Sequence, residues 1–226
     1  MNYISDFIWE RNLRSVNEDS LCLCHVMFNG KPLIFCAICD GVGGLDNGEV
    51  ASGFVIRNLK EHFETMDLSE SFLLRSMTQS ILNVLNACHE ELAGCATTVC
   101  AVIIFGRRCS LISCGDSRVY KGNRRLKQIT FDDTDDLGRL TSCIGHIYPP
   151  RISCRSFTIS FSDTLLICSD GFYKRNERLI SLNPLHHCDN ERSLRNELKH
   201  MYRCAVAMGE RDNCTAIAIR LKREER

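Results

Sequence analysis

Three short acidic motifs lie far apart in this chain, each at the end of an apolar run. Their aspartates are Asp40, Asp170 and Asp212. An apolar run that stops at an Asp-Gly pair predicts a buried strand that brings a carboxylate to the edge of a sheet. Three such carboxylates, brought together, form a site of oxygen ligands, which hard cations such as Mg²⁺ and Mn²⁺ prefer. The chain is therefore expected to fold around a sheet edge that binds divalent cations.

The rest of the composition is that of a globular chain without a charge bias. Its length suits one domain over residues 1–226, since no internal repeat and no Gly/Ser run divides the chain. Lys plus Arg and Asp plus Glu number 28 each, so no basic excess indicates nucleic-acid binding. No stretch approaches the roughly 18 apolar residues of a membrane span. We expect a monomer without nucleic-acid or membrane partners, which ends in a solvated tail of mixed charge at 220–226.

Fifteen cysteines are scattered along the chain, most of them inside apolar runs. Their number is odd, and the chain does not open with a basic segment followed by a long apolar one. Buried free thiols in a reducing cytosol explain this pattern better than a disulfide framework does, so we expect a cytoplasmic protein. Cys36 and Cys39 match a CxxC pair, but they lie in a predicted strand, where they would point to opposite faces. A zinc or redox site is therefore not expected there.

The order of the predicted elements favours an α+β fold. The turn Asn29-Gly30 predicts a hairpin between strands at 20–28 and 32–39. Further strands are expected near 97–105, 109–115, 117–121, 125–130, 151–159, 163–168 and 213–221. Apolar residues spaced by three and four predict helices over 47–64, 69–92 and 190–207. Successive hairpins imply two antiparallel β-sheets that form a central sandwich flanked by helices.

Six short motifs follow one another in an order that carries more information than any one of them. They are the segments 14–19, 40–44, 96–98, 115–118, 168–171 and 212–215, which read RSVNED, DGVGG, ATT, GDSR, CSDG and DNCT. In this order they resemble the metal-dependent protein phosphatases of the type 2C (PPM) family, in their compact bacterial form. The resemblance spans nearly the whole chain. It implies an α-β-β-α sandwich that hydrolyses phosphoserine and phosphothreonine on proteins.

The resemblance also implies a dinuclear Mn²⁺ or Mg²⁺ centre. Asp40, the backbone carbonyl of Gly41, Asp170 and Asp212 would hold the two cations. Two cations about 3.5–4 Å apart activate a shared water and stabilise charge on the phosphoryl oxygens. An Asp-Gly pair on its own is more often a plain turn. The combination of motifs is what favours a metal centre.

Two further roles come from the segment before the first predicted hairpin. By resemblance, Glu18 and Asp19 are outer ligands that hold metal-bound waters, whereas the alternative is a solvated acidic turn. Arg14 would bind the substrate phosphate with a bidentate fork, which lysine cannot copy. Arg11 is a neighbouring competitor, and the spacing to the acidic pair favours Arg14.

The Gly-Asp-Ser-Arg motif leaves two interpretations open. By resemblance, Asp116 and Asp170 would bind a third cation. In the alternative, Asp116 is a structural turn carboxylate paired with Arg118. Thr97 and Thr98 are expected to support the centre through hydroxyl hydrogen bonds or strand packing.

Several departures from the family pattern concern the surroundings of the site. Val42 stands where many eukaryotic relatives carry a histidine proposed as the general acid, and no histidine here can be assigned that task. The pair His186-His187 follows Pro184 in a predicted loop and is not expected to bind metal. Asn12 lies near where relatives often carry a glycine.

The largest departure is a flap segment that is almost deleted. Residues 129–133 resemble its start and residues 140–145 its end, so only a few residues remain between them. We expect a more open cleft and a changed basis of substrate selection. The acidic residues of this segment are interpreted as a solvated loop. They are Asp132, Asp133, Asp135 and Asp136.

These residues are compatible with three functions to different degrees. A phosphatase acting on phosphorylated proteins agrees best with the complete set of carboxylates, and the resemblance implies that a Ser/Thr kinase is among its substrates. A regulatory module of the same fold without turnover is the alternative, motivated by the missing flap. A zinc-binding Cys/His module is disfavoured because the cysteines lack paired CxxC spacing.

Overall fold

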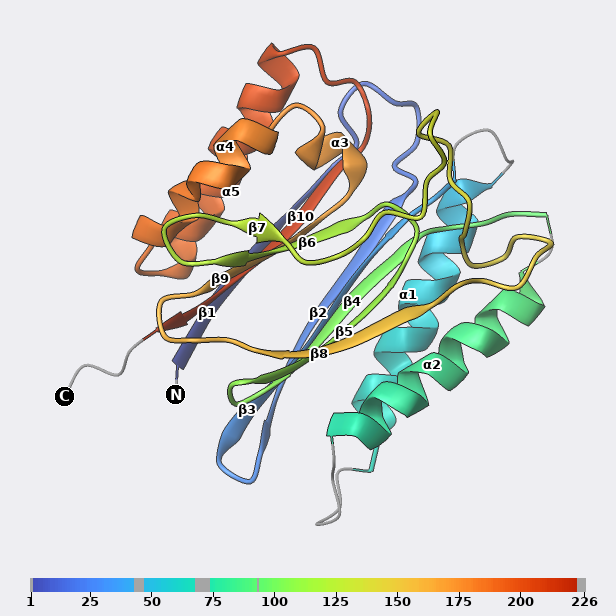
Figure 1. Ribbon diagram of the computed structural model, residues 1–226, viewed down its shortest axis with the longest axis horizontal. Coiled ribbons are helices and arrows are strands. Elements are labelled where there is room, and N and C mark those ends of the chain that lie inside the picture. Colours follow the sequence, from blue (N-terminus) through green and yellow to red (C-terminus); the bar gives the residue numbers. More distant parts are fainter. Residues whose placement is uncertain (1, 43–46, 68–73, 93, 223–226) are drawn as a thin grey trace.

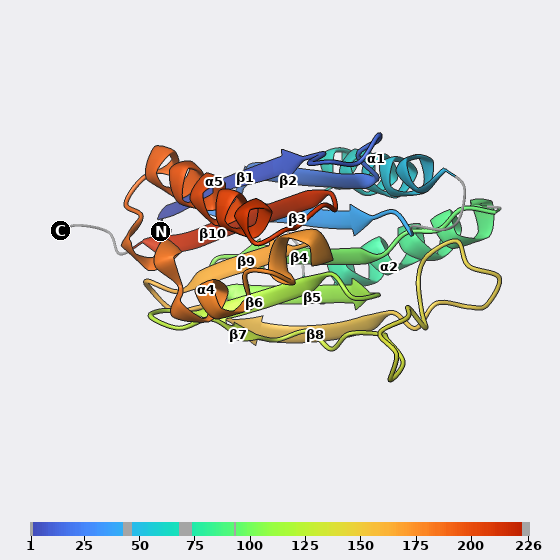
Figure 2. The ribbon, with the colours of Figure 1, turned by 90° about the horizontal axis from the view of Figure 1, so that it is seen from above.

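The two sheets of this protein pack face to face, with helices on both outer faces, in a computed structural model that describes residues 2–42, 47–67, 74–92 and 94–222 (Figure 1). Seen from above, α4 and α5 cover one side and α1 and α2 the other (Figure 2). This confirms the predicted α+β sandwich. The start of the helix predicted at 69–92, the last two glycines of the first acidic motif and the end of the tail lie outside the described residues.

The first sheet has the strand order β1-β10-β9-β6-β7, with every neighbouring pair antiparallel. Its strands are β1 (Asn2–Glu10), β6 (Arg118–Gly122), β7 (Lys127–Gln128), β9 (Thr164–Cys168) and β10 (Cys214–Lys222). On its outer side lie α3 (Asp170–Tyr173), α4 (Glu177–Leu182), the 3-10 helix η1 (Pro184–His187) and α5 (Glu191–Ala207).

The second sheet has the order β2-β3-β4-β5-β8, again antiparallel throughout. Its strands are β2 (Asp19–Phe28), β3 (Lys31–Asp40), β4 (Val99–Phe105), β5 (Arg108–Cys114) and β8 (Ser153–Thr158). Helices α1 (Gly48–Thr65) and α2 (Leu74–Glu91) pack on its outer face. The turn between β2 and β3 has positive φ at Asn29 (49°) and Gly30 (69°), as the predicted hairpin requires.

The side chains of β3 alternate between the two layers of the hydrophobic core. Ile34, Cys36 and Ile38 belong to the cluster between the two sheets, whereas Phe35 and Cys39 belong to the cluster beneath α1 and α2. Because successive side chains of a strand point to opposite faces, a fully apolar strand can serve both layers. The two cysteines of the CxxC pair therefore lie in different layers, as predicted.

Several elements differ from the sequence-based prediction. Strand β1 was not predicted, because the buried residues Ser5 and Asp6 interrupt its apolar pattern. The strand expected over 125–130 shrinks to β7, since the hydroxyl of Thr130 accepts the hydrogen bond of the Val119 N–H (3.2 Å) where a ladder carbonyl would otherwise do so. The short helices α3 and α4 were missed, and η1 replaces the loop expected around Pro184.

The cysteines agree with the expectation of buried free thiols. All fifteen lie in the described part of the chain and are free, and all but Cys154 and Cys204 are buried. No helix among the described residues is long and apolar enough to cross a membrane.

Candidate active site

A cavity of about 90 Å³ opens at one end of the sandwich. Its lining consists of Arg14, Glu18, Asp40, Gly41, Val42, Thr98, Asp116, Leu140, Asp170 and Asp212. The residues predicted from the sequence therefore converge, with Asp19 as the exception. The cavity lies at the seam between the sheets, because Asp40 ends β3 whereas Asp170 begins α3 two residues after β9 and Asp212 precedes β10. Asp212 is thus placed before its strand rather than after one.

The end of β3 is held in place by two threonines. The hydroxyl of Thr98 accepts a hydrogen bond from the Asp40 N–H (3.1 Å), and the hydroxyl of Thr97 donates to the Asp40 carbonyl (2.9 Å). A Cβ at Gly41 would lie 2.5 Å from the carbonyl oxygen of Gly48, so α1 can begin directly over this residue only because it is a glycine. These contacts fix the backbone that carries Asp40.

Arg14 lies at the rim of the cavity, on the loop between β1 and β2. Its Nη2 donates to Asp212 Oδ2 (2.8 Å), and 49% of its side chain is exposed. The hydrogen bond with Asp212 raises the pKa of Arg14 further, so the guanidinium is always charged. Arg11 instead donates to the carbonyl of Ser15 within the same loop (3.0 Å). Arg14 is therefore the arginine available to a ligand in the cavity.

The buried side chain of Asn213 anchors this loop. Its Nδ2 donates to the carbonyls of Arg11 (2.9 Å) and Val16 (3.1 Å), and its Oδ1 accepts from the Glu18 N–H (2.9 Å). One side chain next to Asp212 thus ties down both ends of the segment that carries Arg14. The sequence motif contained Asn213, but its spacing alone did not indicate this role.

Asn12 explains one departure from the family pattern. It adopts a left-handed backbone with φ 54°, a conformation that glycine favours and asparagine tolerates. Its Nδ2 also donates to the carbonyls of Glu210 (2.9 Å) and Asp212 (3.1 Å), which a glycine could not do. Asn12 therefore keeps the required turn and adds a second anchor for the loop.

Asp19 lies behind the cavity rather than in it. It is 1% exposed and pairs in register with Asp40 across β2 and β3. Ser169 donates to its Oδ2 (2.9 Å), while its Oδ1 is buried without a hydrogen-bond partner among the described residues. Burial raises the pKa of Asp19 to about 7, although the nearby hydroxyls of Thr215 and Ser169 favour the charged form. Of the two predicted outer ligands, only Glu18 reaches the cavity surface.

The carboxylates of the site crowd one another. Burial and then the negative charge of Asp19 and Asp170 raise the pKa of Asp40 well above its ordinary value. Burial and Asp170 likewise raise the pKa of Asp116 to about 6. Among the described residues, no three acidic, His or Cys side chains form a ready-made metal cage. The buried unpartnered oxygen of Asp19 and this excess of negative oxygens nevertheless fit a hard divalent cation.

The alternative pairing of Asp116 with Arg118 is wrong. Arg118 binds Asp132 (Nη2–Oδ2 2.7 Å) and Glu177 (Nη1–Oε1 2.8 Å), and its Cζ lies 3.7 Å from the ring centre of Tyr173. Asp116 faces the cavity instead. The same contacts correct the interpretation of Asp132 as part of a solvated loop, since it belongs to a partly buried ion-pair network.

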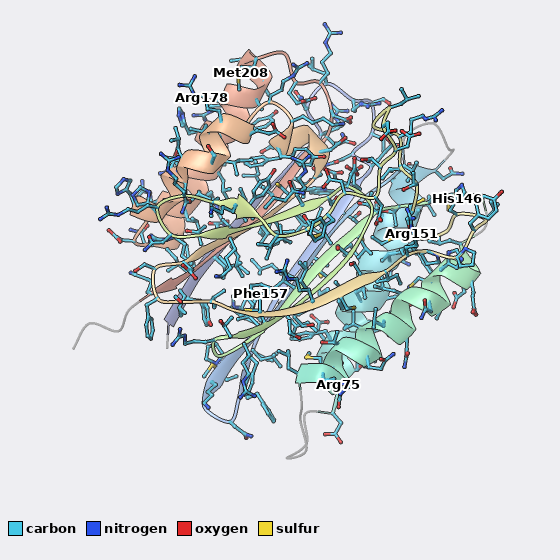
Figure 3. All side chains as sticks on the ribbon, in the orientation of Figure 1. Arg75, His146, Arg151, Phe157, Arg178 and Met208 are labelled. Atoms are coloured by element: carbon cyan, nitrogen blue, oxygen red, sulfur yellow. The ribbon has the colours of Figure 1, made fainter. Side chains whose placement is uncertain are left out.

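The remaining flap segment is a short structured loop. Oδ2 of Asp133 accepts from the N–H of Gly115 (3.0 Å), and Asp135 pairs with Arg139 (2.6 Å). Between β7 and β8, a stretch described throughout, the chain forms only isolated bridges, and Leu140 reaches the cavity rim. Figure 3 shows His146 of this segment far out near α2, where the neighbouring Gly145 N–H donates to His89 (3.1 Å).

Lys174 is the residue of the site that the sequence analysis missed. Its ammonium forms a close ion pair with Asp170, four residues earlier across α3. Burial lowers the pKa of Lys174, but the attraction of Asp170, with Asp116 and Asp212 beyond it, raises the pKa overall. The i,i+4 spacing is the signal that could have revealed the pair, provided that α3 had been predicted as a helix.

Comparisons with known proteins agree with this geometry. The family model described as protein phosphatase 2C matches residues 12–211. The serine/threonine protein phosphatase PstP of Mycobacterium tuberculosis is 32% identical over 183 residues, which cover 70% of this chain and 34% of that protein. The serine/threonine phosphatase stp of Listeria monocytogenes is 28% identical over 70% of this chain and 73% of its own. This chain thus spans about a third of the length of the mycobacterial relative that it matches.

Solved structures show the same fold at lower sequence identity. The serine/threonine phosphatase of S. agalactiae superposes with a TM-score of 0.82 at 20% identity, covering 98% of this chain and 100% of that one. Stp1 from Staphylococcus aureus reaches a TM-score of 0.81 at 24% identity, covering 97% and 95%. The likeness extends over nearly the whole chain.

Proposed function

Because this chain belongs to the protein phosphatase 2C family, we propose that it hydrolyses phosphoserine and phosphothreonine on proteins with the help of divalent cations. The observation that carries the proposal is the cavity itself, in which carboxylates from both sheets meet with Arg14 at the rim. Such a site joins negative ligands for cations to a positive ligand for a phosphate. The relatives named above are serine/threonine phosphatases, which supports the same substrate class.

Two Mn²⁺ or Mg²⁺ ions are proposed as the cofactors. Their ligands would be Asp40, the carbonyl of Gly41, Asp170 and Asp212, with Glu18 and Asp19 acting through water. When bound, the cations would supply an activated water and neutralise charge on the phosphoryl oxygens. Asp40 is the central ligand in this proposal because Thr97 and Thr98 fix its backbone at the seam between the sheets.

Arg14 is proposed to bind and orient the phosphate. Its guanidinium is half-exposed, and its Nη2 is already aimed at the carboxylate of Asp212 on the cavity wall. A planar guanidinium can offer two parallel hydrogen bonds to a phosphate, which a lysine cannot. Asn213 and Asn12 keep the loop of Arg14 at the cavity, so they act as positioning residues. In the described part of the chain no histidine lines the cavity, and none is assigned as a general acid.

The substrates and the cellular location of the protein are also proposed. Phosphorylated proteins, including a Ser/Thr kinase, are the proposed substrates, as the resemblance to bacterial members of the family implies. A reducing cytosol is the proposed location, supported by fifteen cysteines that are free and mostly buried. Burial raises the pKa of Cys36, Cys100 and Cys168, so these thiols resist oxidation.

The test compares wild type with Asp40→Asn and with Asp136→Asn as a control on an exposed loop residue. Hydrolysis of p-nitrophenyl phosphate and a phosphothreonine peptide is measured in EDTA, Mg²⁺ and Mn²⁺. Wild type and control should be active only with a cation. Asp40→Asn should lose about 100-fold or more, since cation catalysis contributes several kcal/mol and 1.36 kcal/mol is tenfold in rate.

Thermal unfolding provides a readout that does not depend on turnover. In EDTA, Asp40→Asn should melt higher than wild type, because it removes one charge from the crowded carboxylates. Mn²⁺ should stabilise the wild type and the Asp136→Asn control but not Asp40→Asn. Full activity in EDTA, or full metal-dependent activity of Asp40→Asn, would refute the proposed centre. A folded protein that binds Mn²⁺ without hydrolysing either substrate would favour the regulatory module.

A further inference from the structure

Lys174 brings a positive charge to one of the two carboxylates that the sequence predicts to share a third cation. Its ammonium contacts Asp170, and Asp116 and Asp212 attract it as well. Asp116 and Asp170 are the two residues expected to share the third cation. The position of Lys174 is set by α3, in which its N–H donates to the Asp170 carbonyl (2.9 Å). Lys174 is therefore the C-cap of the short helix that begins at the carboxylate it neutralises.

We propose that the ammonium of Lys174 takes the place of a third cation between Asp116 and Asp170, so that this chain works with two exchangeable cations and one built-in charge. The inference rests on the proposed metal centre. It assigns to Lys174 a positioning role, since the ammonium would act on the reaction only through the carboxylates. A divalent cation entering between Asp116 and Asp170 would meet a positive charge already bound to one of its ligands.

Two other roles for Lys174 agree less well with the structure. A lysine that binds the substrate phosphate should line the cavity, but the described lining contains Arg14 and not Lys174. An ion pair contributes little where both partners are exposed, and the Lys174 side chain is 56% exposed. The partner here, Asp170, has a side chain only 17% exposed, and it faces the cavity.

Arg118, the other basic residue to consider, does not neutralise Asp116 in place of Lys174. Arg118 is the nearest arginine in sequence, and Asp132 and Glu177 bind it. The charge of Lys174, by contrast, lowers the pKa of Asp116 against the effects of burial and Asp170. By contact, Lys174 is therefore the counter-charge of Asp170, the carboxylate that lines the cavity together with Asp116.

The experiment counts the Mn²⁺ ions bound to the full chain by equilibrium dialysis and isothermal titration calorimetry. The variants are Lys174→Gln, which removes the charge, and Lys174→Asp, which adds a ligand. The matched control is Arg175→Gln, which removes a charge at the next residue, where the side chain lies 4.0 Å from Glu210 instead. Wild type and control should saturate at two Mn²⁺ per chain.

Both Lys174 variants should bind a third Mn²⁺. The Kd of this third ion should be at least about tenfold lower than that of any third ion on the wild type, which corresponds to 1.4 kcal/mol. Adding Asp116→Asn to Lys174→Asp should abolish that third site and leave the other two. Three sites in the wild type, or unchanged stoichiometry in both variants, would overturn the inference while the metal centre stands. Absence of Mn²⁺ binding in the wild type and every variant would refute the metal centre and the inference together.

Discussion

Truncating Asn213 to alanine should loosen the Arg14 loop at a cost that can be worked out from the structure. The change removes three hydrogen bonds, to Arg11, Val16 and Glu18. At about 1 kcal/mol each, they would contribute about 3 kcal/mol if their partners stayed dry. Arg11 and Val16 are exposed, however, so water can hydrate the freed carbonyls. We therefore expect a loss of about 2 kcal/mol in the free energy of unfolding.

Urea unfolding measures this loss, and thermal unfolding should show a melting temperature lower by about 4–8 °C for a chain of this size. The same loosening should raise KM for p-nitrophenyl phosphate about fivefold, because it weakens a charge-assisted contact that typically contributes 1.5–3 kcal/mol. The value of kcat should change less than about twofold, since the cation ligands stay in place. Asn86→Ala on the exposed side of α2 is the control, expected within about 0.5 kcal/mol of wild type.

Two results would contradict this reasoning. If Asn213→Ala unfolds within about 0.5 kcal/mol of wild type with an unchanged KM, the loop is held by other contacts, such as those of Asn12. If kcat falls while KM stays constant, Asn213 acts on the neighbouring Asp212 rather than on the loop.

Two further substitutions test the packing and the rim of the site. Gly171→Ala should destabilise the protein by about 3 kcal/mol in urea unfolding, because the new Cβ would clash with the Asn213 carbonyl and lie 3.0 Å from the Asp212 Cβ. Gly53→Ala, whose Cβ would meet nothing closer than 3.8 Å, should instead stabilise α1 by up to about 1 kcal/mol, and equal effects at both sites would contradict the argument. Arg14→Lys should raise KM about tenfold through loss of the planar fork, whereas Arg11→Lys should change it less than about twofold; similar effects in steady-state kinetics would rule out Arg14 as the phosphate ligand.

The strands that lead to the site could be predicted because their apolar pattern, their turns and their terminal residues all indicate the same structure. Strand β3 is apolar from Pro32 to Cys39, starts after an Asn-Gly turn and stops at Asp40, so both its length and the place of its carboxylate follow from local rules. Asp170 follows a similar run in β9. The convergence of these ends, by contrast, needed the order of six motifs, because no local rule brings residues more than a hundred positions apart together.

Other parts could not be predicted from local rules, because their charged residues are neutralised by partners far away in the sequence. Asp6 is buried in β1 at 4% exposure, and Arg195 of α5 neutralises it with Nε contacts of 3.0 and 2.9 Å. A buried acid looks like a loop residue until its distant partner is known. Arg118 illustrates the reverse case, since it stands two residues from Asp116 but pairs with Asp132. Sequence proximity suggested the wrong partner there.

The charges supplied by the chain are distributed unevenly over the seam, and this points to Asp40 as the link between cation binding and folding. Arg14 pairs with Asp212 and Lys174 with Asp170, and both acids belong to the β9–β10 side. No ion pair among the described residues includes Asp40, which comes from the other sheet and has a strongly raised pKa. A cation bound at Asp40 would join the two sheets where protein charges alone leave them repelling each other. Its binding free energy would then add to the stability of the sandwich, by about 2.7 kcal/mol at a cation concentration 100 times the Kd.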